Sequence, residues 1–179
     1  DFHPSSEKLY FTDNGRDWLG DDSPSCELNR VDADGGFYGF PFKHATNVVD
    51  PEFGNINSGF KFIDPILELG AHVAPTGITF YDGVMFPEEF QENLFIALHG
   101  SWNRSQKVGY KLIRVVFNEA GGVEASEDFI TGWLESSIDE DGNLVETVLG
   151  RPSAPFIMSD GSMLISDDKA NLIYRVVLK

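Results

Sequence analysis

Three segments of the chain share one pattern of hydrophobic and polar residues. Each begins with a short hydrophobic strand, passes through a turn or loop, and returns as a second strand in which hydrophobic and polar residues alternate. The first strands are predicted at residues 9–13, 94–99 and 163–167, and the return strands at residues 28–31, 110–117 and 172–178. The pattern therefore predicts an internal repeat of antiparallel strand pairs, with irregular spacing.

Shorter elements are predicted between these strand pairs. Proline inside residues 62–69 favours an edge strand, because proline removes a donor from the ladder. Residues 128–133 are predicted to form an outer strand, and residues 135–146 an acidic hairpin that turns at Asp141-Gly142-Asn143. One turn of helix with proline at its first position is predicted at residues 87–90.

The repeat and the composition predict an all-β fold. Aromatic residues make up 13% of the chain and glycines number 18, which suits blades of short strands better than helices. No linker divides the chain, so we expect residues 1–179 to form a single partial β-propeller domain of about three blades. Three blades cannot close a ring and leave unpaired strand edges. We therefore expect the remainder of a larger propeller, or another copy of the chain, to close the open edges.

The charge limits the partners. The formal net charge is −16, with only 13 Lys and Arg residues, so nucleic acid and anionic membranes are poor partners. The acidity has two open interpretations, plain solubility or a calcium-rich or saline setting outside the cell. Cys26 is the only cysteine, which excludes an internal disulfide and leaves the redox compartment open. No hydrophobic run reaches the length of a membrane-spanning helix.

The loop inside the first strand pair is acidic and rich in turn residues. Together with the end of the preceding strand it carries Asp13, Asn14, Asp17, Asp21 and Asp22. Carboxylate, amide and backbone oxygens suit calcium, which binds several oxygen ligands at once. The spacing differs from that of an EF-hand loop, so a solvated turn is the alternative interpretation.

Two further groups lie at predicted strand ends. His99 follows a hydrophobic strand, and Trp102, Asn103 and Arg104 follow it in the loop. A histidine and an indole so placed can bind a planar anionic ring, or can simply pack against the fold. Arg151, beside a proline, can grip a carboxylate bidentately or can be a plain surface charge.

One set of motifs runs through nearly the whole chain: TDNGRDWLGDD, ELNRV, GGFYGFP, HVAPTGITFY, LFIALHGSWNRS and GRPSAPF. In combination they resemble the C-terminal part of the glucose/sorbosone dehydrogenase family, and HGSWNR is similar to its sorbosone/pyranose dehydrogenase-like branch. Members of this family are six-bladed β-propellers that use pyrroloquinoline quinone (PQQ) and calcium. The resemblance therefore implies about three blades, half of a six-bladed propeller.

The resemblance also implies roles for individual residues. The calcium ligands are expected to be the backbone carbonyls of Gly15 and Arg16. PQQ bears three carboxylates, so hydrogen-bond donors and cations should converge on it. The residues expected to contact it are Asn14, His99, Trp102, Asn103 and Arg151. Ser153 stands where relatives often have a second arginine.

The activity that the resemblance implies is oxidation of a sugar hydroxyl or aldehyde by hydride transfer to PQQ, with an external electron acceptor and a periplasmic or extracellular location. The family's histidine base and an arginine–asparagine pair match no residue of this chain, so we expect the 179 residues alone to be inactive. Two alternatives stay open. One is a secreted propeller that binds without catalysis; the other is a glycoside hydrolase or lactonase with paired carboxylates such as Asp13 and Asp17.

Overall fold

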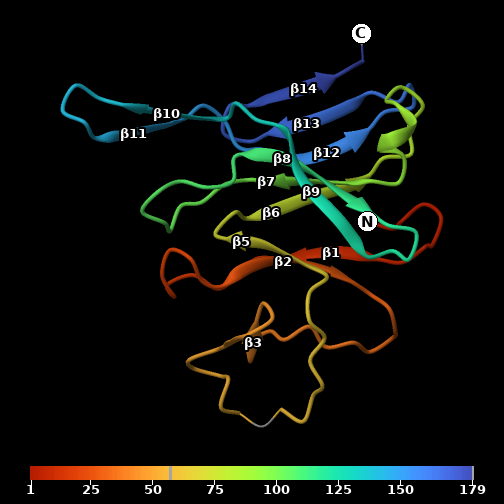
Figure 1. Ribbon diagram of the computed structural model, residues 1–179, viewed down its shortest axis with the longest axis vertical. Helices are drawn as coiled ribbons and strands as arrows, with labels where there is room; N and C mark the ends of the chain where they lie inside the picture. Colours follow the sequence, from red (N-terminus) through yellow and green to blue (C-terminus); the bar gives the residue numbers. More distant parts are fainter. Residues whose placement is uncertain (57, 179) are drawn as a thin grey trace.

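The computed structural model describes residues 1–56 and 58–178, and it consists of short antiparallel strands (Figure 1). Within these residues there is no α-helix; one 3-10 turn, η1 Glu88–Phe90, follows Pro87 where a turn of helix was predicted. None of the described residues belongs to a helix long and apolar enough to cross a membrane. The strands are β1 Tyr10–Asp13, β2 Ser25–Arg30, β3 Lys43–His44, β4 Val48–Val49, β5 Leu67–Ala71, β6 Pro75–Phe80, β7 Leu94–Leu98, β8 Lys111–Phe117, β9 Val123–Ile130, β10 Leu134–Ile138, β11 Leu144–Val148, β12 Pro152–Ile157, β13 Met163–Asp167 and β14 Leu172–Val176.

Three larger sheets form blade-like layers that stack along the long axis of Figure 1. From bottom to top they are β1-β2-β5, β6-β7-β8-β9 and β12-β13-β14, and the two short pairs β3-β4 and β10-β11 lie outside the stack. The predicted repeat is confirmed, because β1 with β2, β7 with β8, and β13 with β14 are antiparallel neighbours. The all-β architecture of about three blades is therefore confirmed as well.

Hydrophobic side chains fill the two spaces between these sheets. Leu28 of the first sheet and Ile96 of the second belong to one buried cluster. Phe95 of the second sheet and Met163 of the third belong to the other. The neighbours Phe95 and Ile96 enter different clusters because successive side chains of a strand point to opposite faces. β7 is thus buried on both faces, which explains its uninterrupted hydrophobic sequence.

β6 joins the three sheets, since it packs against β1 on one side and β12 on the other. The Thr76 hydroxyl donates to Ser153 O at 2.6 Å. A Cβ at Gly77 would lie only 2.5 Å from Ala154 Cα, so the close approach of β6 to β12 requires glycine. This contact brings the ends of neighbouring sheets together.

Several strands differ from the prediction. β2 begins at Ser25 instead of residue 28, and the two-residue strands β3 and β4 were not predicted. β5 begins at Leu67 instead of residue 62, because Phe62 forms an isolated bridge with Phe37 and Pro65 has no N–H to donate. β9 covers residues 123–130 instead of 128–133; its exposed polar residues carry no hydrophobic pattern, and Trp133 is buried beyond its end. β6 was not predicted, since a strand that begins with proline gives a weak signal.

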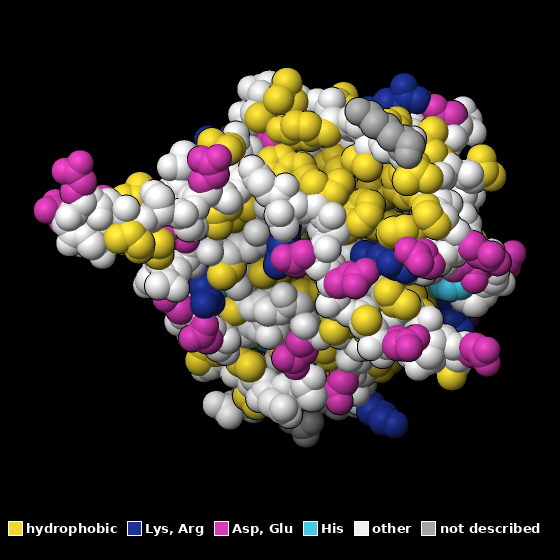
Figure 2. Space-filling model, turned by 45° about the horizontal axis from the view of Figure 1, so that its top comes forward, with side chains coloured by type: hydrophobic (Ala, Val, Ile, Leu, Met, Phe, Trp, Pro, Cys, Tyr) yellow, Lys and Arg dark blue, Asp and Glu magenta, His cyan; other side chains and the backbone are white. Residues whose placement is uncertain are grey.

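The β10-β11 pair confirms the predicted acidic hairpin, which projects from the stack as a separate arm (Figure 1). In Figure 2 the same arm ends in acidic side chains. Its turn is held by Asp139, whose carboxylate accepts the backbone N–H groups of Asp141 and Asn143 at 3.0 and 2.8 Å.

The outer face of the β12-β13-β14 sheet is hydrophobic and exposed. Phe156 is 62% exposed and Ile173 is 70% exposed. The register places both on one face, because Phe156 lies opposite Leu164 and Ile173 lies opposite Ser166, two residues further along β13. Figure 2, which brings the top of Figure 1 forward, shows a broad hydrophobic area on this side.

Candidate functional site

Three equivalent strands end at the same end of the stack. The repeated sequences LYFTDN, LFIALH and MLISDD place Asn14 after β1, His99 after β7 and Asp168 after β13. The His99 Nε2–H donates to Asp168 Oδ1 at 2.9 Å, which links the second sheet to the third. The loops that follow these strands therefore form a common surface.

Arg151 fixes the loop after β7. Its Nε–H donates to His99 O at 3.1 Å, its Nη2 donates to Gly100 O, and its guanidinium lies 5.7 Å from the centre of the Tyr110 ring. Its backbone N–H donates to the Asp167 carboxylate at 2.9 Å. Burial acts to raise the pKa of Asp167, yet hydrogen bonds from backbone N–H groups hold that pKa below its ordinary value. Arg151 is thus a partly buried anchor of the His99 loop.

Trp102 and Trp18 stand together at the surface. Their ring centres are 5.6 Å apart at an interplanar angle of 79°, and they are 64% and 76% exposed. Asn103 Nδ2 donates to Asp17 Oδ1 at 3.4 Å, and Arg104 is hydrogen-bonded to the same acidic loop. These bonds tie the loop after β1 to the loop after β7.

Gly15 lies at a crowded point of the acidic loop. A Cβ at this position would lie 2.7 Å from Pro24 O, so the backbone there must belong to glycine. The Gly15 N–H donates to Cys26 Sγ at 3.4 Å, and burial raises the pKa of the Cys26 thiol. The carbonyl oxygens of Gly15 and Arg16 accept no hydrogen bond from any residue of 1–56 or 58–178.

The Arg16 side chain is engaged outside this loop. Its Nη1 donates to Asp50 Oδ2 at 2.6 Å, and the His44 Nε2–H donates to the same oxygen at 2.9 Å. Burial acts to raise the pKa of Asp50, but these hydrogen bonds hold it well below its ordinary value. The Arg16 side chain is therefore occupied, and only its backbone carbonyl is available for the predicted contact with calcium.

Two cavities adjoin at this end of the fold. Asn14, Gly15 and Trp102 line the smaller one, with a volume of about 70 Å³, and His99, Trp102 and Arg151 line the larger one, with a volume of about 500 Å³. Trp102 lines both. The structure therefore brings these five predicted residues to one end of the fold. Of the other two, Asn103 lies in the same loop as Trp102, and the Arg16 side chain points away toward Asp50.

Sequence reasoning missed several residues that line these cavities. Lys107, Asp168 and Lys169 line the larger cavity, and His72 lines the smaller one. With Arg151, the larger cavity has three cationic side chains and one carboxylate, although the chain as a whole carries a formal charge of −16. Asp168 could have been found from the repeat, since it corresponds to His99; the lysines carried no comparable signal.

Stacked antiparallel sheets with strand-end loops gathered at one end are the architecture of part of a β-propeller. The model of the TrAA12-like family matches residues 29–178, so the chain belongs to the TrAA12-like family. An uncharacterized protein of Borreliella burgdorferi strain B31 is 42% identical over 178 residues, which cover 98% of this chain and 45% of that protein.

Several solved structures share the fold. A Trichoderma reesei enzyme of family AA12, in its iodide structure, has a TM-score of 0.69 at 23% identity, over 97% of this chain and 50% of that one. The PQQ domain of pyranose dehydrogenase from Coprinopsis cinerea has a TM-score of 0.65 at 19% identity, over 96% and 51%. A glucose dehydrogenase has a TM-score of 0.66 at 20% identity, over 98% and 43%. The predicted resemblance and half-propeller fold are confirmed, and the chain spans about half the length of these relatives.

Proposed function

We propose that the end of the fold that carries Asn14, Gly15, His99, Trp102 and Arg151 is part of the PQQ- and calcium-binding face of a sugar dehydrogenase. The observation that carries this proposal is the gathering of Lys107, Arg151 and Lys169 around an exposed indole in a strongly acidic chain. Support comes from two proteins of similar fold, the PQQ domain of a pyranose dehydrogenase and a glucose dehydrogenase.

The larger cavity fits the chemistry of PQQ. A planar ring with three carboxylates needs positive charge, hydrogen-bond donors and a flat apolar surface. Lys107, Arg151 and Lys169 supply the charge, and Trp102 supplies an exposed ring. His99 is held in one orientation by its hydrogen bond to Asp168. Asn103 follows Trp102 in the same loop, where its side chain donates to Asp17 of the acidic loop.

The acidic loop fits calcium through its backbone. The described residues contain no group of three or more His, Cys, Asp or Glu side chains placed to hold a metal ion. Calcium also accepts backbone carbonyl oxygens as ligands, and those of Gly15 and Arg16 are not used by hydrogen bonds from the described residues. We therefore assign the calcium contacts to these two carbonyls.

When bound, PQQ would supply a hydride acceptor and calcium would supply a Lewis acid. The residues of this chain hold and orient the group. Arg151 fixes the His99 and Gly100 carbonyls and hence the direction in which the following loop leaves β7. Trp102 offers an exposed ring face on which a planar ring can stack. The sugar substrate, the external electron acceptor and a periplasmic or extracellular location belong to the same proposal.

We also propose that the hydrophobic face around Phe156 and Ile173 packs against a further blade, supplied by the remainder of a larger propeller or by another copy of the chain. A sheet face this apolar is normally covered. Sedimentation of the 179-residue chain tests the second possibility: self-association that Ile173→Asp abolishes supports packing between copies, and a monomer at every concentration contradicts it.

Calorimetric titration of PQQ into the chain with calcium tests the cofactor proposal. Trp102→Ala should weaken binding roughly tenfold, because it removes the stacking surface. Lys169→Ala should weaken binding by a smaller factor, and the matched control Lys61→Ala, another exposed lysine, should leave it unchanged. We expect no turnover of an aldose by the chain alone. Equal effects of the two lysine variants contradict the site, and sugar binding without PQQ binding favours a non-catalytic propeller.

A further inference from the structure

Trp18 is exposed although the loop that carries it is bonded to its neighbours. Its indole is 76% exposed, and no aromatic side chain in residues 1–56 and 58–178 is more exposed. On either side of it, Asp17 accepts Asn103 Nδ2 at 3.4 Å, and Asp21 Oδ1 accepts the Ser105 N–H at 3.1 Å. The exposure of Trp18 is therefore a fixed feature of the fold and does not come from a loose loop.

The backbone of Trp18 is strained. Its φ is +70°, a left-handed conformation that a bulky side chain rarely adopts. Glycine would adopt the same conformation at no steric cost. An indole that is kept at a strained position and is also left in solvent adds little to the core, so its placement indicates a role in binding.

The two exposed indoles form a corner at the mouth of the site. The Trp18 and Trp102 ring centres are 5.6 Å apart, and the two ring planes meet at 79°. Trp102 lines both cavities of the proposed cofactor face, whereas Trp18 lines neither. A group that stacks on Trp102 therefore leaves Trp18 free to contact a second ring beside it.

The polar groups around Trp18 suit hydroxyl groups. Arg104 Nη2 donates to Asp22 Oδ1 at 2.8 Å, and the Asp22 side chain is largely exposed, so its other oxygen is open to solvent. On the opposite side, the larger cavity brings three cationic side chains close to the same corner. Hydroxyl groups both donate and accept, so a neutral polyhydroxylated ring fits this mixture better than an ion of either sign.

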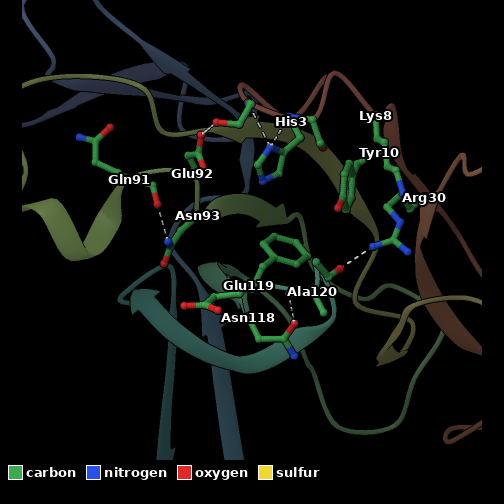
Figure 3. A pocket seen from close by; sticks show the side chains of 14 residues that line it. His3, Lys8, Tyr10, Arg30, Gln91, Glu92, Asn93, Asn118, Glu119 and Ala120 are labelled. Atoms are coloured by element: carbon green, nitrogen blue, oxygen red, sulfur yellow. Dashed lines mark hydrogen bonds between the residues drawn. The ribbon is translucent and has the colours of Figure 1, made fainter.

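The cavity at the opposite ends of the strands offers no comparable ring face (Figure 3). Its volume is about 430 Å³, but Tyr10 in its wall is only 2% exposed and is packed in the core. Asp32 pairs there with both Lys8 and Arg30, at 2.6 and 2.9 Å. An aromatic face that a ligand can reach is thus a property of the Trp18 end of the fold.

We propose that Trp18 is a specificity-determining residue, on which the ring of the sugar substrate stacks at the mouth of the cofactor cavity; this inference rests on the proposed function. The C–H face of a sugar ring packs against an exposed indole, and its hydroxyl groups bond to carboxylates such as that of Asp22. Trp102 then contacts the quinone and Trp18 contacts the sugar, on two planes that are nearly perpendicular.

NMR titration of the 179-residue chain with D-glucose, with PQQ and calcium either absent or present, tests this role. The indole N–H signal of Trp18 should shift, whereas that of the buried Trp133 should stay in place. D-sorbitol, the open-chain polyol made by reducing glucose, offers no ring face and should shift the Trp18 signal much less.

Two variants and a control measure the contribution of the ring. Trp18→Ala should weaken glucose binding roughly three- to tenfold, because it removes the stacking surface, and Trp18→Phe should keep most of the affinity. The matched control Phe2→Ala removes another exposed aromatic side chain, before the start of β1, and should bind as the unaltered chain does. Trp18→Gly should melt no lower than Trp18→Ala, since glycine adopts the positive φ without strain.

The outcomes separate this role from the proposed cofactor face. Glucose binding that Trp18→Ala and Trp18→Gly weaken more than they weaken PQQ binding supports the inference. Equal glucose binding in these variants and the unaltered chain overturns it and leaves the cofactor proposal standing. Equal shifts with glucose, sorbitol and choline, or no shift with glucose under either condition, also overturn it. Glucose binding that depends on Trp18 in a chain that binds no PQQ supports the stacking role and contradicts the cofactor proposal alone.

Discussion

Replacement of Arg151 by lysine tests whether the two hydrogen bonds from its planar guanidinium group organise the loop after β7. The Arg151→Lys variant keeps the charge but cannot reach both His99 O and Gly100 O, so at least one hydrogen bond from a charged donor is lost. Such bonds contribute about 1.5–3 kcal/mol. Because the side chain is only partly buried, we expect the lower value, a loss of about 1.5 kcal/mol in the free energy of unfolding. For a chain of this size the melting temperature should fall by about 3–6 °C.

Urea unfolding, followed by circular dichroism, measures the loss. The matched control is Arg175→Lys, since Arg175 forms an exposed ion pair with Asp160 and such pairs contribute about 1 kcal/mol or less. The control should therefore change the unfolding free energy less than Arg151→Lys does. Equal losses of unfolding free energy in the two variants, or no loss in Arg151→Lys, would refute the proposed role of the Arg151 guanidinium group in holding the loop.

Three further outcomes are expected. Gly15→Ala should lower the unfolding free energy by about 1–3 kcal/mol, because its Cβ would lie 2.7 Å from a backbone oxygen. At Gly122 the nearest atom to such a Cβ is the end of a flexible side chain at 3.2 Å, so Gly122→Ala should lower the unfolding free energy less. Urea titration compares the two variants. The pKa of Asp50 is depressed below its ordinary 3.8 by hydrogen bonds from His44 and Arg16, so its stabilising effect is complete above that pH and is lost as the pH falls below it. Asp50→Asn should flatten this acid-side decline in melting temperature, and an unchanged profile would contradict the network. Cys26 is buried and its thiol pKa is raised, so a thiol reagent should react only when the chain unfolds; rapid reaction of the native chain would show that the Gly15–Cys26 contact opens.

The strands that repeat were predictable because their hydrophobic pattern is local. β1, β7 and β13 each combine strand-forming residues with a polar residue directly after the strand. Packing on both faces of β7 makes its own sequence continuously hydrophobic. β6 and β9 were missed or misplaced for the opposite reason. β6 is defined by its close approach to β12, which demands glycine, and β9 is an edge strand with polar, exposed residues.

The candidate site was predictable in part. The strand-end positions of Asn14, Gly15 and His99 follow from the repeat and the turn residues after it. The contacts of Arg151 with the backbone of the His99 loop did not follow, since they join residues 51 and 52 positions apart. Neither did the lysines of the larger cavity, because exposed lysines have no sequence pattern that predicts which surface they share.

A crystal structure of the chain with PQQ and calcium tests the central claim most directly. The account predicts the quinone in the cavity lined by His99, Trp102 and Arg151, with the calcium ion against the carbonyl oxygens of Gly15 and Arg16. Density for PQQ at the opposite end of the strands, or calcium bound only by surface carboxylates such as those of the β10-β11 arm, would contradict it.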